Sequence, residues 1–414
     1  MKQEFQFSFW NYNAACLTTL EDVKHWADSG ATVAMLPHFR YDRDKVEDLK
    51  QIIDACADHN MKVILCVEGL EFPFADDEEA YRALASQVYR DFGQHPAVKA
   101  VALGDEPSNR NLYRQLEKSI QLVREEMPGM DFHVNFLPYY RTMGDDVLGG
   151  EDYLPFMKGV ISRCGFSSFS YDCYCQMHYH AGEHDMCGYF TSMNGYAEIA
   201  EETGTEWWNT VLSTGHWDYH VPSEDDLRWQ LSTSAASGAK GLLWYQFYDS
   251  FDLANYHGSP IDEFGNRSAT FYAISHVTKL FRYQHGELLA NLKLKEIYHF
   301  RKAYGGYQEF PSEGRGVITA FDSSEELPAI LSFFVDENGE EYVVLVNNSP
   351  SVTGKFTFVL DKAKTSRMVR VRENGKRFDD CFRSGGTAMY CETEKERKIA
   401  VWLSPGQLEI FKIS

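Results

Sequence analysis

The stretch Val101-Ala102-Leu103-Gly104-Asp105-Glu106-Pro107-Ser108 combines an apolar run with an abrupt acidic end. The apolar part predicts a strand of a parallel sheet, because such strands are buried on both faces. Proline cannot donate a ladder hydrogen bond, so the strand should end at Pro107. Carboxylates at the carboxyl end of a buried strand suit ligand binding, since barrels of parallel strands carry their functional groups there. A helix N-terminus, whose dipole favours acidic side chains, is the simpler explanation of the same pair.

Short apolar runs alternate with amphipathic helical stretches eight times over the first two thirds of the chain. Eight such units, spaced by about 30–40 residues, predict an α/β fold of the (β/α)8 TIM barrel type. An open doubly wound sheet is the alternative, but it would normally carry a glycine-rich loop where this chain has Asn11-Tyr12-Asn13-Ala14. The predicted strands are Phe5–Trp10, Thr32–Pro37, Lys62–Val67, Ala100–Gly104, Phe132–Phe136, Gly165–Tyr171, Glu206–Leu212 and Gly241–Phe247. The predicted helices include Leu20–Ser29, Asp44–His59, Glu78–Phe92, Leu112–Glu126, Tyr189–Thr203 and Ser223–Ser237.

Near Leu292 the sequence pattern changes to short segments in which apolar and polar residues alternate, separated by turn residues. This pattern predicts a C-terminal antiparallel β-sandwich, with Asn-Gly hairpin turns at residues 338–339 and 374–375. We expect residues 1–288 to form the barrel and 289–414 the sandwich, which would serve as an accessory domain. The predicted strands are Val317–Phe321, Ala329–Phe334, Glu341–Asn347, Gly354–Leu360, Arg367–Arg372, Lys398–Leu403 and Gln407–Ile413.

The composition limits the class of partner. A formal net charge of −21 argues against nucleic acid and anionic membranes, which require basic patches. The nine cysteines are odd in number and scattered, as expected of reduced thiols. The N-terminus shows no signal peptide and no apolar run is long enough to span a membrane, so we expect a cytoplasmic protein.

Polar and aromatic side chains follow the predicted barrel strands at their carboxyl ends. Carboxylates and amides bind hydroxyl groups, and aromatic faces stack on sugar rings, so their convergence predicts a carbohydrate substrate. Each residue alone is more commonly a hydrogen-bonded loop residue, and the inference therefore rests on their joint placement. The candidates are Trp10, Asn11, His38, Glu68, Asp105, Glu106, Asn135, Tyr171, Asp172, His216, Trp217, Trp244, Gln246 and Asp249.

Three of these regions resemble clan A glycoside hydrolases, particularly the family 42 β-galactosidase-like proteins. The resemblance covers roughly the first 285 residues, and its most specific element is Leu103-Gly104-Asp105-Glu106-Pro107. Phe169-Ser170-Tyr171-Asp172 and the strand-eight segment 236–247 also carry it, as does the tail 258–266. The resemblance implies a TIM barrel that hydrolyses a terminal sugar or a short oligosaccharide, without a cofactor and as a homo-oligomer.

The clan pattern at strand four is Asn-Glu-Pro, in which the amide holds the sugar 2-substituent and the glutamate is the general acid/base. By position, the resemblance implies that Glu106 is the acid/base and that Asp105 replaces the amide. A carboxylate there can accept a hydrogen bond from a 2-hydroxyl group or orient a 2-acetamido group. The second possibility resembles the Asp-Glu pair of hexosaminidases, whose substrate supplies the nucleophile.

The clan also expects a nucleophilic glutamate at the carboxyl end of strand seven, and here the chain departs from the pattern. Glu206 is the only glutamate of that strand and stands at its entry end. The carboxylates that can stand opposite Glu106 are Asp172, which we prefer, Asp249 and Glu68. A retaining mechanism needs carboxyl groups about 5–5.5 Å apart, whereas an inverting one needs a wider pair. The absent glutamate also leaves open a barrel that binds carbohydrate without hydrolysing it.

Cysteine and histidine residues are dense after strand six. Thiolate and imidazole groups bind zinc in closed tetrahedral sites, which makes a zinc-dependent hydrolase a third hypothesis. We nevertheless predict no metal, because a histidine-rich loop with reduced thiols is the commoner structure. The weak candidate ligands are Cys173, Cys175, His178, His180 and Cys187.

Overall fold

The computed structural model describes residues 3–140, 142–250, 255–383 and 388–414. Two compact units make up the chain, and each is described by itself. One unit comprises residues 6–221 and 241–275, and the other comprises residues 222–240 and 276–414 together with the first residues of the chain. The predicted boundary between residues 288 and 289 stays a prediction.

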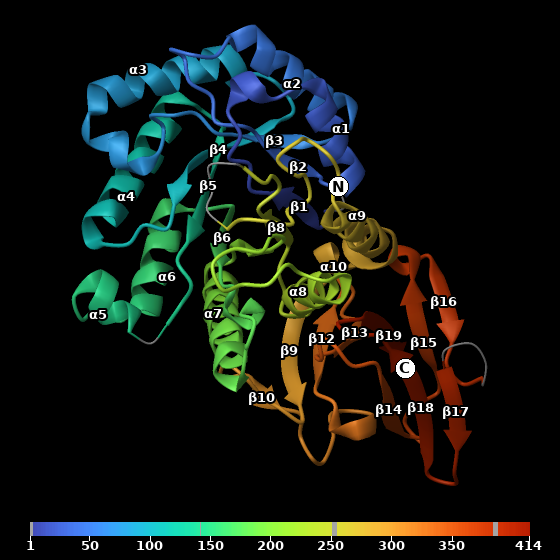
Figure 1. Cartoon of the computed structure of the whole chain (residues 1–414). Helices are drawn as coiled ribbons and strands as arrows, with labels where there is room; N and C mark the ends of the chain where they lie inside the picture. Colours follow the sequence, from blue (N-terminus) through green and yellow to red (C-terminus); the bar gives the residue numbers. More distant parts are fainter. Residues whose placement is uncertain (1–2, 141, 251–254, 384–387) are drawn as a thin grey trace. The chain divides into compact units, whose positions relative to one another are not determined.

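Eight parallel strands form the first unit in the sheet order β1-β8-β7-β6-β5-β4-β3-β2 (Figure 1). The edge strands β1 and β2 also meet, because Thr32 donates its backbone N–H to the Phe7 carbonyl at 2.9 Å and His38 donates to Asn13 at 3.0 Å. The predicted TIM barrel is therefore confirmed. The strands are β1 (Gln6–Phe9), β2 (Val33–Met35), β3 (Lys62–Leu65), β4 (Val98–Asp105), β5 (Asp131–Phe136), β6 (Ser168–Asp172), β7 (Glu206–Leu212) and β8 (Gly241–Tyr245).

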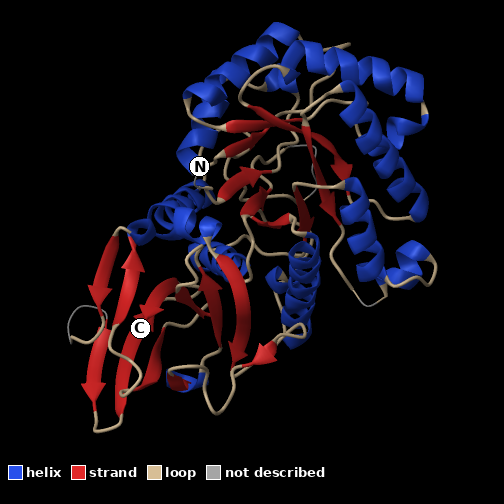
Figure 2. Cartoon of the chain, turned by 180° about the vertical axis from the view of Figure 1, so that it is seen from behind, coloured by secondary structure: helices blue, strands red, loops and turns tan. Residues whose placement is uncertain are grey.

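Helices alternate with these strands along the chain, and the helices of the barrel unit lie around its parallel strands (Figure 2). The described helices that lie outside the predicted segments given above are α5, α6, α9 and α10. None of the described helices is long and apolar enough to cross a membrane. The helices are α1 (Leu20–Ser29), α2 (Val46–Asp58), α3 (Glu78–Val88), α4 (Arg110–Glu126), α5 (Met143–Leu148), α6 (Tyr153–Cys164), α7 (Glu183–Thr203), α8 (Glu224–Ala236), α9 (Ala269–Phe281) and α10 (Glu287–Asn291).

Apolar side chains that point inward fill the interior of the barrel below the end at which the strands finish. Trp208 on β7 is the largest of them and packs with Val33, Met35, Ile64 and Leu243. Because strands alternate their side chains between two faces, every second residue of each strand points into the barrel. The upper end of the same interior carries polar side chains, which form the site described below.

The second unit contains two sheets, as the predicted β-sandwich requires, and their strands pair antiparallel except for β10, which pairs with β9 in parallel. Their orders are β10-β9-β12-β13-β19-β15-β16 and β11-β14-β18-β17. Apolar residues from both sheets, such as Phe333 and Phe358, share one core. The strands are β9 (Lys293–Phe300), β10 (Gln308–Glu309), β11 (Ile318–Ser323), β12 (Ala329–Val335), β13 (Glu341–Asn347), β14 (Gly354–Asp361), β15 (Met368–Arg372), β16 (Arg377–Asp380), β17 (Ala388–Glu392), β18 (Glu396–Leu403) and β19 (Leu408–Ile413).

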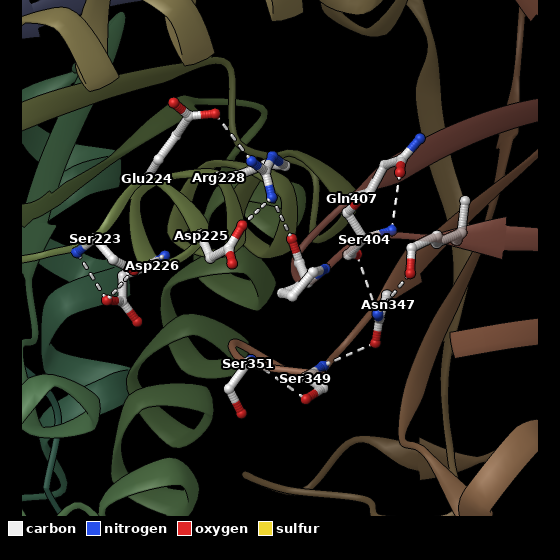
Figure 3. Close-up of polar contacts among 12 residues, drawn as sticks. Ser223, Glu224, Asp225, Asp226, Arg228, Asn347, Ser349, Ser351, Ser404 and Gln407 are labelled. Carbon is white, nitrogen blue, oxygen red and sulfur yellow. Dashed lines mark hydrogen bonds and ion pairs between the residues drawn. The ribbon is translucent and has the colours of Figure 1, made fainter. Parts of the chain in front are cut away.

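Polar contacts fix α8 to the loops of these sheets (Figure 3). Ser223 caps the helix by accepting a hydrogen bond from the Asp226 backbone N–H at 3.2 Å. Arg228 on the same helix pairs with Asp225 and donates to the Pro405 carbonyl at 2.7 Å. Helix α8 is therefore an integral part of the sandwich unit.

Candidate active site

The end of β4 presents Asp105 and Glu106 through an irregular backbone. The register of β4 against β5 shifts between Ala102 and Asp105, which is a β-bulge of the kind that re-aims side chains near active sites. Gly104 within the bulge has φ = +129°, and Glu106 adopts a left-handed φ of +44°. The Glu106 backbone N–H donates to the Asn135 carbonyl at 2.9 Å, which holds this conformation. A left-handed glutamate is uncommon, and such strain concentrates at functional sites.

Replacing Gly104 by alanine should destabilise the fold. A Cβ atom there would lie 2.6 Å from the Phe72 ring, in addition to the strain of the positive φ. We expect a loss of about 1–3 kcal/mol in the free energy of unfolding, measured by urea titration. Gly129→Ala is the matched control, because Gly129 also has a positive φ but its Cβ would meet nothing within 4 Å. Equal losses in the two variants would contradict the role of the Phe72 contact.

Asn135 on β5 joins the carboxyl groups of two neighbouring strands. Its Nδ2 donates to Asp105 Oδ1 at 3.0 Å and to Asp172 Oδ1 at 2.8 Å. Its Oδ1 accepts from Ser170 Oγ at 2.8 Å and from Thr210 Oγ1 at 3.0 Å. An amide has two N–H donors and two acceptor lone pairs, so all four are engaged. The two hydroxyl groups therefore fix the orientation of the amide and direct both of its N–H groups at carboxylates.

Asp105, Glu106 and Asp172 form a cluster of three carboxyl groups, which we call the carboxyl cluster. Burial is the main cause that raises the pKa of Asp105 to about 7. Burial, followed by the charges of Glu106 and Asp105, raises the pKa of Asp172 well above its ordinary value. Burial also raises the pKa of Glu106, whose carboxyl group interacts with that of Asp172. Like charges in contact cannot all ionise, so the carboxyl cluster holds a proton at neutral pH.

A pocket of about 200 Å³ opens beside the carboxyl cluster. Trp10, Tyr12 and His38 line it together with Asp105, whose side chain remains accessible from the pocket. Glu71 also lines it and was not among the sequence candidates. The only sequence signal for Glu71 was its place shortly after strand three, three residues beyond the predicted Glu68.

Tyrosine rings surround the opening of the barrel. Tyr12 lines the same pocket as Asp105, which places this ring close to the carboxyl cluster. Tyr245 Oη lies 3.0 Å from Tyr256 Oη, and the Tyr245 ring stacks on Tyr174 with centroids 5.5 Å apart. Tyr174, Tyr245 and Tyr256 were absent from the sequence candidates. Knowledge of which face of β8 points inward would have identified Tyr245.

Two predicted aromatic residues lie on the outer face of the barrel. Tyr171 stacks on Tyr196 of α7 with centroids 4.4 Å apart. Trp244 is buried between Leu243 and Tyr245, which belong to the barrel interior or pack against it. Because side chains alternate along a strand, the structure does not bring Tyr171 or Trp244 into the pocket.

Other predicted polar residues donate hydrogen bonds to backbone carbonyl groups of the protein. Asn11 donates to the Met35 carbonyl at 3.3 Å, and Gln246 donates to the Tyr248 carbonyl at 2.8 Å. The peptide bond between Tyr245 and Gln246 is cis. His216 is buried, and burial lowers its pKa to about 4, so its ring is neutral at neutral pH. Trp217 beside it is 70% exposed.

The three carboxylates proposed to stand opposite Glu106 have different surroundings in the structure. Asp249 accepts hydrogen bonds from the hydroxyl and backbone N–H groups of Ser259, at 2.5 and 3.1 Å. Glu68 is half-exposed and pairs with Arg40 at 3.3 Å. Asp172, by contrast, belongs to the carboxyl cluster, whereas Glu206 starts β7 at the opposite end of the barrel.

The cysteine and histidine residues after β6 are arranged as hydrogen-bond partners. Cys173 Sγ and Cys175 Sγ lie 3.5 Å apart, and Cys175 donates to the Asp185 carbonyl. His178 Nδ1 lies 3.1 Å from Asp185 Oδ1, while His180 and Cys187 are exposed. Across the described ranges, no group of three or more histidine, cysteine, aspartate or glutamate side chains could hold a metal ion.

Comparison with solved structures finds similar folds at low sequence identity. The β-galactosidase of the psychrophilic Marinomonas ef1 has a TM-score of 0.51 at 12% identity, over 67% of this chain and 60% of that chain. The cold-adapted β-galactosidase of Rahnella sp. R3 has a TM-score of 0.54 at 11% identity, over 71% of this chain and 58% of that one. This chain thus spans about three fifths of the length of those enzymes.

No protein-family model and no curated protein matches the sequence. At identities this low, the structural likeness shows the fold and does not assign the chain to family 42. The function must therefore be argued from the site itself.

Proposed function

We propose that this protein is a glycoside hydrolase that acts on a terminal sugar or a short oligosaccharide. The observation that supports it is the carboxyl cluster, which holds a proton at the mouth of the barrel beside an aromatic pocket. Glycoside hydrolysis requires one protonated carboxyl group to protonate the leaving oxygen and one ionised carboxylate on the other side of the bond. The fold shared with β-galactosidases agrees with this proposal.

Glu106 is the general acid in this proposal. The N–H groups of Asn135 oppose the rise in the pKa of Asp105 and Asp172, but burial outweighs them at Asp172. Catalysis by Glu106 therefore requires that the bound sugar draw the shared proton to Glu106. Asp172 is the second carboxylate and acts as nucleophile or base. Asp105 accepts a hydrogen bond from the sugar 2-substituent, because it lines the pocket while Asn135 has no free donor or acceptor.

Substrate-assisted hydrolysis of a 2-acetamido sugar is a second candidate. The carboxyl groups of Glu106 and Asp172 interact with each other in the free protein, whereas those of a retaining pair stand roughly 5–5.5 Å apart. A 2-acetamido group would supply its own nucleophile, oriented by Asp105, so no second carboxylate would have to stand across the bond. If Asp172 is instead the second carboxylate, the incoming sugar must separate the carboxyl group of Glu106 from that of Asp172.

A panel of α- and β-linked nitrophenyl glycosides, with and without a 2-acetamido group, tests both candidates. We expect turnover of at least one member. Turnover of 2-hydroxy sugars would assign the second role to Asp172, and turnover of 2-acetamido sugars alone would favour substrate assistance. If the protein binds sugars by calorimetry but turns over none, it is a carbohydrate-binding barrel and the proposed activity is wrong.

Thr210→Val should shift the acidic limb of the pH–rate profile to higher pH. The variant removes one of two hydroxyl groups that orient Asn135, so its N–H groups stabilise the anions of Asp105 and Asp172 less well and their pKa values rise. Loss of one buried hydrogen bond should also lower stability by about 1 kcal/mol. Thr210→Ser, which keeps the hydroxyl group, should restore the profile. An unshifted limb in Thr210→Val would show that the Thr210 hydroxyl has no positioning role.

A further inference from the structure

Trp217 is held at the surface in an unusual conformation. Its side chain is 70% exposed, and its backbone has a left-handed φ of +49°. The side chain of Asn255 clamps it, accepting from the Trp217 N–H at 3.0 Å and donating to the Trp217 carbonyl at 2.9 Å. Asn255 itself has φ = +52°. Both backbone groups of Trp217 are thus fixed by one side chain, and both residues adopt backbone conformations that are rare outside glycine and asparagine.

A continuous series of rings connects Trp217 with the carboxyl cluster. The ring of Trp217 lies 5.1 Å from that of His216, which lies 5.5 Å from Tyr245. The ring of Tyr245 lies 6.1 Å from that of Tyr12. Tyr12 is next to the carboxyl cluster, because it lines the same pocket as Asp105. Trp217 is therefore three ring-to-ring contacts away from the point where the glycosidic bond would be cleaved.

A single exposed aromatic residue is normal on a protein surface and needs no explanation by itself. Trp217 differs from an ordinary one because the loop around it is strained and clamped. Tyr179 provides the comparison within this unit: it is 60% exposed, and the structure gives it a single backbone hydrogen bond to the Asp218 carbonyl. A clamped, exposed indole presents a rigid flat face, which is what stacking on the C–H face of a sugar ring requires.

We propose that Trp217 is a stacking platform for a sugar unit beyond those at the cleaved bond, so that the substrate is an oligosaccharide rather than a monosaccharide with a small aglycone. This inference rests on the proposed function, which places the cleaved bond at the carboxyl cluster. That position sets the direction in which the sugar chain runs toward Trp217. A ring stacked on Trp217 is separated from the carboxyl cluster by the rings of His216 and Tyr245, and so belongs to a different unit of the chain. The occupant is uncharged, because hydroxyl groups and ring faces suffice for such contacts.

Kinetics with substrates of different length test the platform. For whichever sugar the nitrophenyl panel identifies, kcat/KM is measured on the nitrophenyl monosaccharide and on the matching tri- to hexasaccharides. In Trp217→Ala the ratio of oligosaccharide to monosaccharide kcat/KM should fall at least tenfold, with Trp217→Phe keeping most of it. Asn255→Ala, which leaves the indole unclamped, should give an intermediate fall. Tyr179→Ala is the control and should leave the ratio and the activity unchanged.

Binding separates this inference from the proposed activity. Calorimetry with gluco-, manno-, galacto- and N-acetylglucosamine oligosaccharides is performed on the full chain and on Trp217→Ala, and needs no turnover. Binding that weakens at least tenfold in the variant supports the platform even if no glycoside is hydrolysed, in which case only the proposed activity fails. An unchanged Kd or an unchanged kcat/KM ratio in Trp217→Ala, or the absence of oligosaccharide binding by the native chain, would overturn the platform.

Discussion

Glu106→Gln is expected to lower kcat/KM by about 10²- to 10⁴-fold on substrates with poor leaving groups, the range typical of a lost general acid. Glutamine is nearly isosteric with glutamic acid but cannot donate the acidic proton to the leaving oxygen. Substrates with activated nitrophenyl leaving groups need less protonation, so their loss should be smaller. The measurement compares kcat/KM across a series of aryl leaving groups of rising pKa.

Glu206→Gln is the matched control for this experiment. Glu206 is the only glutamate of β7, where the clan pattern would place a nucleophile, but it starts the strand at the far end of the barrel. We expect the Glu206 variant to keep its activity. Full activity in Glu106→Gln, or comparable losses in both variants, would contradict the assignment of Glu106.

Asp172→Asn should lower activity by on the order of 10³-fold and at the same time stabilise the fold at neutral pH. Burial and the charges of Glu106 and Asp105 raise the pKa of Asp172, so the folded protein binds this proton more tightly than the unfolded chain does. The resulting stability is present below the unfolded pKa of about 3.9 and is lost as the pH rises through the folded pKa. Asparagine cannot ionise and avoids that loss.

The two readouts of Asp172→Asn are activity on the best nitrophenyl glycoside and Tm at pH 7. Low activity with a higher Tm is the expected signature of a carboxylate kept for function. Rescue of turnover by added azide would identify Asp172 as the nucleophile or base. A variant with normal activity would exclude that role for Asp172, and substrate assistance by a 2-acetamido group would then become the leading account of the reaction.

Much of the fold could be predicted because its signals are local. Apolar runs such as Glu206–Leu212 and Gly241–Phe247 coincide with β7 and β8 almost residue for residue. Helix α6 and strand β9 were missed for a shared reason. Their burial depends on partners that are distant in sequence, and β9 consists mostly of residues that are at least partly exposed.

The chemistry of the site was easier to predict than its orientation. The motif around Asp105 and Glu106, followed by Asp172, identified the carboxyl cluster, since charge at the end of an apolar strand is conspicuous. Sequence could not decide which face of β8 points inward, so Trp244 was among the candidates and Tyr245 was not. It also placed Asn135 among the substrate ligands, whereas the structure engages every donor and acceptor of its amide within the protein.

The pH dependence of kcat/KM in the native chain and in Glu106→Gln, on one activated nitrophenyl glycoside, tests the central claim most directly. A general acid must be protonated, so native activity should fall as the pH rises through the raised pKa of Glu106. This alkaline limb should disappear in Glu106→Gln while the acidic limb remains. An alkaline limb that persists unchanged in the variant would show that another group delivers the proton, and would contradict the account.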